Sequence, residues 1–145
     1  MPFRFSLATV LRIRESIELR EEQALMRIQL EMTRIANQIE ELSATIAKAY
    51  LAREREMQQP IPASHLQMYI SQMNAAAEKR KALYVEFLAL EQQRIKQMRI
   101  YQAAHRDREA LTDMSKKQRD VYEHEQALSH QKNLDDIFVA RRQRG

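Results

Sequence analysis

The chain has 145 residues and a net charge of +4, with 30% charged residues, 6% aromatic residues and no cysteine. This composition supplies too little apolar material for a thick globular core, and the lack of cysteine excludes a disulfide scaffold and a thiolate nucleophile. No apolar run approaches the length of a membrane span, and the N-terminus becomes charged too soon for a signal peptide, so we expect a cytosolic protein without membrane insertion.

The first predicted element is a long helix from about residue 6 to about residue 58, with Ser6 as its possible cap. Upstream, Arg14, Glu18 and Glu21 interrupt the apolar pattern. Further along, apolar residues advance by alternating steps of three and four, which is the heptad spacing of helices that pack on one another. These residues are Leu25, Ile28, Met32, Ile35, Ile39, Leu42 and Ile46.

A turn is predicted at residues 59–63, because two of the chain's three prolines, Pro60 and Pro62, lie there. Proline lacks an N–H group and forces the preceding residue out of the helical region, so the first helix must end before it. Ser64, followed three residues later by Gln67, fits a capping box that restarts a helix. A connection this short favours antiparallel neighbours.

The second predicted helix runs from about residue 64 to about residue 141 and has its own heptad seam. Arg80 and Arg94 occupy seam positions, where their stems can pack while their charged heads reach water. The apolar members of the seam are Leu66, Tyr69, Met73, Ala76, Leu83, Phe87, Leu90, Met98 and Tyr101.

Together these elements predict an all-α fold, a long antiparallel two-helix coiled-coil hairpin whose second helix is longer than the first. We expect residues 1–145 to form a single domain. Folding about Ile61 sets residue i opposite about residue 122 − i, so the chain after about residue 119 has no partner from the first helix. We call this unpartnered end the overhang.

The end of the overhang becomes abruptly hydrophobic and basic in the stretch NLDDIFVARRQRG. A lone helix gains nothing from exposing Leu134, Ile137, Phe138 and Val139 to water, and such a patch usually contacts another protein. A fold-back of the chain or burial in a homodimer is the alternative explanation.

No catalytic, cofactor or metal site is predicted. The only glycine is Gly145, so no glycine-rich phosphate-binding loop is available. His124 begins a stretch like a zinc-binding helix motif, but Leu128 stands where the second histidine is needed. Positive and negative charges are interleaved along most of the chain, which argues against a nucleic-acid partner, since only Arg141, Arg142 and Arg144 form a bare cationic tip.

Two terminal stretches resemble one protein family. The first stretch starts at residue 3 and reads FRFSLATVLRIRESIELREEQA. It resembles the start of the flagellar FliJ family, with its Phe-x-Phe, its Leu-x-x-Val-Leu and the Arg-rich helix that follows. The second stretch ends at residue 145 and reads KNLDDIFVARRQRG. It resembles the closing motif of the same family. The size of the chain, its single prolyl break and its hairpin pattern agree with this resemblance along nearly the whole length.

The resemblance implies a non-enzymatic coupling stalk of the flagellar type III export apparatus, similar to the paired terminal helices of the gamma subunit in rotary ATP synthases. Its implied partners are the hexameric flagellar export ATPase, the export gate membrane protein and export chaperones. The implied location is the cytoplasm, peripheral at the cytoplasmic face of the cell membrane. The residues implied to face the ATPase ring are Leu7, Val10, Leu11, Arg14, Leu134, Asp135, Ile137, Phe138, Arg141 and Arg142.

The gate-facing surface implied by the resemblance lies towards the bend, at Tyr50, Tyr69 and Ile70. The two tyrosines either cap the core with their hydroxyls in water or form an aromatic patch near the bend. Two functions remain as alternatives to a flagellar stalk: a stalk protein of a virulence-type type III injectisome, and a general soluble coiled-coil chaperone for export substrates.

Overall fold

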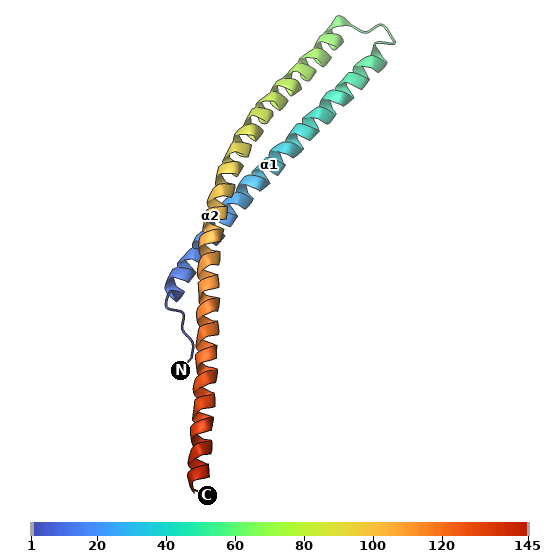
Figure 1. Ribbon diagram of the computed structural model, residues 1–145. Helices are drawn as coiled ribbons and strands as arrows, with labels where there is room; N and C mark the ends of the chain where they lie inside the picture. The colour runs from blue at the N-terminus through green and yellow to red at the C-terminus, as the bar shows by residue number, and fades with distance from the viewer. Residues whose placement is uncertain (1, 145) are drawn as a thin grey trace. The chain divides into compact units, whose positions relative to one another are not determined.

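The structure, a computed structural model that describes residues 2–144, contains two helices and no strand within that range. Helix α1 spans Ala8–Glu56, with 49 residues, and α2 spans Ala63–Arg144, with 82 residues. The predicted fold class is confirmed, because the two helices pack on each other as a hairpin and the second is longer (Figure 1). Helix α1 begins two residues later than predicted, and α2 continues three residues further.

The described chain divides into two compact units. Residues 2–20 and 101–144 form one, which we call the terminal unit, and residues 21–100 form the other, the hairpin unit. The single domain predicted from the sequence stays a prediction.

The connection between the helices lies at residues 57–62 in the hairpin unit (Figure 1). The carbonyl oxygen of Pro62 accepts hydrogen bonds from the backbone N–H groups of His65 and Leu66, at 3.0 and 3.4 Å. The prediction that Ser64 caps the second helix was therefore wrong. Proline's fixed φ suits the entry to a helix, so α2 starts directly after Pro62, and Ser64 lies inside the first turn.

The core of the hairpin unit is thin and follows the predicted α1 seam. Its buried side chains are Leu25, Ile35 and Ile39, of which Ile35 is only 1% exposed. Every other predicted seam residue of this unit is half-buried. A two-helix arrangement covers each seam residue from one side, so half-burial is the expected result.

Polar contacts between the helices confirm the predicted register. Arg80 Nη1 donates to Ser43 Oγ at 3.2 Å, and Gln97 Nε2 donates to the Glu21 carboxylate at 2.6 Å. The Arg94 head bonds the Glu91 carboxylate one turn earlier on α2, at 2.9 and 2.6 Å. Both arginines are half-buried at their predicted seam positions, and their heads bond Ser43 and Glu91, whereas the prediction placed the heads in water.

In the terminal unit, the first helical hydrogen bond of α1 runs from the Leu11 N–H to the Leu7 carbonyl, so Leu7 and not Ser6 occupies the cap position. The residues before it lie along α2 without regular structure (Figure 1). The rings of Phe3 and Tyr122 lie 5.6 Å apart, and the Arg119 guanidinium lies 5.5 Å from the Phe3 ring centroid.

These contacts extend the paired part of α2 beyond the predicted limit at about residue 119. The prediction used the helical rise of about 1.5 Å per residue for the whole first segment. An extended chain advances about 3.3 Å per residue, so the residues before α1 reach further along α2. Every described residue after Tyr122 is exposed, so the overhang begins there.

Candidate functional site

The described residues contain no group of three or more His, Cys, Asp or Glu side chains able to hold a metal ion. Several shallow grooves lie along the helices of the described residues. No helix in the range 2–144 is long and apolar enough to cross a membrane. The residues singled out by the sequence lie in three places: the start of α1, the end of α2 and the region near the bend.

The N-terminal candidate residues lie at the start of α1, in the terminal unit. Leu7 and Leu11 are half-buried, whereas Val10 is 41% exposed. Arg14 Nη1 donates to the Asp107 carboxylate on α2 at 3.3 Å. Most of this set is thus engaged in packing α1 on α2, and Val10 is its most accessible apolar member.

The polar residues that appeared to interrupt the α1 seam bridge the two helices. The Glu18 carboxylate accepts a hydrogen bond from Arg108 Nε at 2.5 Å and lies 3.1 Å from His105 Nδ1. The Arg108 hydrogen bond, followed by the contact with His105, lowers the pKa of the Glu18 carboxyl against the opposing effect of burial. Sequence reasoning missed this cluster, although Glu18 falls in the seam register opposite His105.

The C-terminal candidate residues occupy the last turns of α2, where all of them are exposed. Leu134 is 53% exposed, Ile137 52% and Phe138 68%. Basic side chains fill the last turn of α2, where they complement the partial negative charge of a helix C-terminus. This end of the overhang presents large apolar side chains beside free cationic groups.

The structure does not bring the two terminal sets together. The described N-terminal residues make their last ring contact with α2 where Phe3 meets Tyr122. Leu134 lies twelve residues further along α2, which corresponds to about 18 Å at about 1.5 Å per residue. The C-terminal set is therefore presented by a single helix, and no joint surface with Leu7 or Val10 exists.

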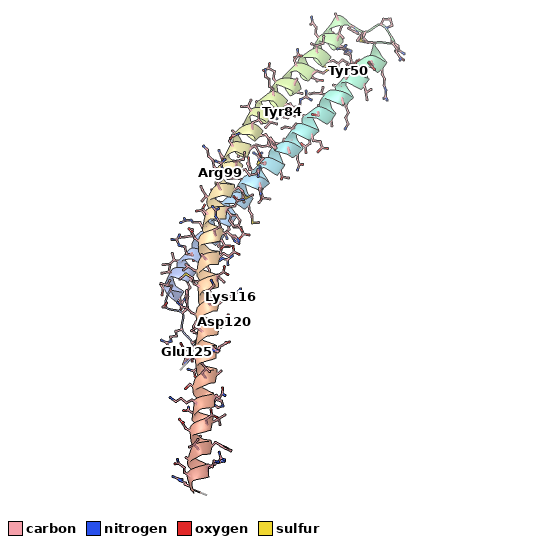
Figure 2. All side chains as sticks on the ribbon, viewed as in Figure 1. Tyr50, Tyr84, Arg99, Lys116, Asp120 and Glu125 are labelled. Carbon is pink, nitrogen blue, oxygen red and sulfur yellow. The ribbon has the colours of Figure 1, made fainter. Side chains whose placement is uncertain are left out.

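Near the bend, Tyr50, which is labelled in Figure 2, is 46% exposed. Ile70 is 42% exposed. Tyr69 is half-buried, and its hydroxyl donates to the Glu56 carboxylate at 2.7 Å, which raises the pKa of the phenol. The Tyr69 hydroxyl thus joins the last turn of α1 to α2. Arg53 stands 5.8 Å from the Tyr50 ring centroid, a cation–π distance.

A further groove lies in the terminal unit between the N-terminal segment and α2, with a volume of about 560 Å³. Pro2, Phe3 and Arg4 form one wall, and residues from Lys117 to Glu125 form the other. Glu125 is on α2 where the N-terminal segment runs beside it (Figure 2). No sequence pattern predicts this groove, because it depends on the extended path of the first residues.

One protein-family model matches the chain over residues 3–145, which is nearly its full length. The description of that family is "Flagellar FliJ protein". No curated protein and no solved structure matches the chain. The matched range includes both terminal motifs. Of the residues in these motifs, only Gly145 lies outside the described range.

Proposed function

Because the chain belongs to the FliJ family, we propose that it is a non-enzymatic coupling element of the flagellar type III export apparatus. The family supports a role connected with flagellar export. Our more specific proposal is that one unit binds the hexameric export ATPase and the other contacts the export gate.

The exposed end of the overhang is the observation that carries this proposal. Ile137 and Phe138 are more than half exposed, and no other segment of the described chain covers them. They lie beside the cations of Arg141 and Arg142. Apolar side chains surrounded by charge are typical of the central anchors of protein interfaces. A ring lined with acidic loops would attract this tip, and salt would weaken the attraction.

The overhang indicates which part of the chain would meet the ring first. The family resemblance implies that paired terminal helices approach the ATPase. In this chain residues 134–142 belong to a lone helix, so we propose that they enter the contact first. Val10, the most accessible apolar residue of the N-terminal candidate set, would contribute only at the mouth of the ring.

For the gate we propose the exposed pair Tyr50 and Ile70, in the hairpin unit, as the contact surface. Tyr69 belongs to this surface as a positioning residue, because its hydroxyl is already bound by Glu56. An escort role towards export chaperones is part of the proposal. Location at the cytoplasmic face of the membrane follows from the gate contact.

The experiment compares two substitutions with matched exposure. Phe138→Glu and Leu30→Glu each place a carboxylate at a side chain that is 68% exposed, one in the overhang and one on α1. Full-length variants are titrated into the purified export ATPase, and both binding and ATP hydrolysis are measured. Circular dichroism checks that both variants remain helical.

We expect Phe138→Glu to weaken ATPase binding by about thirtyfold, since an interface anchor contributes about 2 kcal/mol. Leu30→Glu should bind like the unchanged chain. Equal binding by both variants would contradict the proposed ATPase contact. Intact ATPase binding by Phe138→Glu, together with lost retention of unfolded export substrates, would favour the general chaperone alternative.

A further inference from the structure

A second exposed face of α2 lies away from both α1 and the proposed ATPase contact. In an α-helix successive residues are rotated by about 100°, so residues 7, 11 and 18 positions from Val121 return to within about 20° of it. The members of this Val121 face in the terminal unit are Ala103, Ala110, Met114, Val121, Leu128, Lys132 and Val139.

The Val121 face is exposed over its whole length. Met114 is 43% exposed, Val121 58%, Leu128 53% and Val139 52%, and the two alanines are exposed as well. Apart from Lys132, all of its members are apolar. Its span from residue 103 to residue 139 corresponds to about 54 Å of helix. An apolar strip of this length on a helix is typical of a packing surface.

The order of side chains along this face makes it complementary to itself when two helices run antiparallel. Suppose that Val121 of one copy packs on Val121 of a second copy. A residue that follows Val121 by a given number of positions in one copy then lies level with the residue that precedes Val121 by the same number in the second. Met114 then meets Leu128, and Ala103 meets Val139. The stem of Lys132 crosses the small Ala110, which leaves room for it.

Charges on the two edges of the face fit the same arrangement. In an antiparallel pair, residues on the same edge of the two helices face each other. Arg106 of one copy then lies beside Asp135 of the second. The long arginine side chain can reach the carboxylate of that aspartate. On the other edge Gln118 faces Glu125, which can accept its amide N–H groups.

Two further edge contacts are compatible with this pairing. Lys117 faces His124, whose ring can accept a hydrogen bond at a nitrogen without a proton. Asp136 approaches Asp107, whose charge is already paired with the Arg14 guanidinium at 3.3 Å. A parallel arrangement would instead place Lys132 on Lys132 in the seam, which is unfavourable.

The groove beside the N-terminal segment supports a helix as the occupant. Its α2 wall consists of Lys117, Gln118, Val121 and Glu125, together with the Tyr122 ring, and is therefore centred on the Val121 face. The opposite wall carries Pro2, Phe3 and Arg4, so apolar and charged side chains line both sides of the hollow.

We propose that the Val121 face binds the same face of a second copy of this chain in an antiparallel homodimer. The proposal is independent of the ATPase contact, because Leu134, Ile137 and Phe138 point to other sides of α2 by the rotation of about 100° per residue. The dimer would therefore leave these three side chains uncovered. Because it sets the second copy beside the tip, entry of a lone helix into the ring requires the dimer to separate.

The first test is the oligomeric state of full-length variants by sedimentation equilibrium. Leu128→Glu and Leu134→Glu each place a carboxylate at a leucine that is 53% exposed on α2, six residues apart. We expect Leu128→Glu to weaken dimerisation by more than about tenfold and Leu134→Glu to leave it unchanged. Circular dichroism checks that both variants keep their helix content.

A monomeric unchanged chain at concentrations on the order of 100 µM would overturn the proposal, since a dimer of use in the cell needs a micromolar Kd or better. So would an equal loss of dimerisation in both variants. A loss of ATPase binding in Leu134→Glu but not in Leu128→Glu would separate the ring contact from the dimer contact.

Cysteine cross-linking tests the antiparallel register directly, because the chain has no cysteine of its own. A Val121→Cys chain should form a disulfide-linked dimer under mild oxidation. A Met114→Cys chain should cross-link poorly by itself and efficiently when mixed with a Leu128→Cys chain. Efficient cross-linking of Met114→Cys to itself would overturn the antiparallel arrangement.

Discussion

Replacing Glu18 with Gln should destabilise the terminal unit, because Glu18 is the acid that joins α1 to α2 there. Its side chain is 16% exposed, and that of its partner Arg108 is 23% exposed. The carboxylate receives the Arg108 Nε hydrogen bond at 2.5 Å and contacts His105 at 3.1 Å. The amide of Gln keeps the shape but removes the charge from both contacts.

The magnitude follows from the burial of this pair. Hydrogen bonds to charged groups contribute about 1.5–3 kcal/mol and neutral ones about 0.5–1.5, so removing the charge should cost about 1.5 kcal/mol. For a chain of this length that loss lowers Tm by about 4 °C. Exposed ion pairs contribute less, at most about 1 kcal/mol.

Glu31→Gln is the matched control. Glu31 also lies on α1 and pairs with an arginine, Arg34, but both side chains are about half exposed, at 43% and 55%, and the pair stays within one helix. We expect this variant to lose about 0.3 kcal/mol. Thermal and urea unfolding, followed by circular dichroism, measure both variants.

Equal losses for Glu18→Gln and Glu31→Gln would refute the reasoning that burial and bridging between helices set the strength of the pair. A double-mutant cycle with Arg108→Met isolates the pair itself. A coupling free energy near zero would show that Glu18 and Arg108 do not stabilise each other.

Three further predictions concern stability. The folded-state pKa of Glu18 is lowered, so its contribution to the free energy of unfolding should be present above the ordinary carboxyl value of about 4.3 and be lost as pH falls through the lower folded value. The unchanged chain and Glu18→Gln should therefore converge in stability in acid. A difference in stability that persists at the lowest pH would contradict this prediction. Tyr69→Phe removes the hydroxyl that donates to Glu56 and should cost about 1 kcal/mol in urea unfolding, and an unchanged stability would contradict the role of that bond. Ile35→Ala, at a side chain 1% exposed, should cost about 3 kcal/mol, against less than about 0.5 for Leu30→Ala at 68% exposure, and similar losses would argue against a core at this seam.

The hairpin was predictable because its signals are local and repeated. The heptad spacing placed Ile35 and Ile39 in the core, and Pro60 and Pro62 located the bend. The register followed from the position of the bend alone, since two helices of equal rise pair at equal distances from it.

The contacts that the sequence did not predict depend on geometry outside this regular pattern. Glu18 appeared to interrupt the seam because apolar spacing says nothing about which charges meet across it. The contact between Phe3 and Tyr122 depends on an extended segment that advances further per residue than a helix.

The most direct test of the central proposal is amide hydrogen exchange of the full-length chain, alone and with the export ATPase. In the free monomer, residues 134–144 form an exposed helix without packing partners from their own chain and should exchange fast. The proposal predicts strong protection of this segment when the ATPase is bound, with little change at residues 57–62. Protection confined to other parts of the chain, with residues 134–144 still exchanging fast, would contradict it.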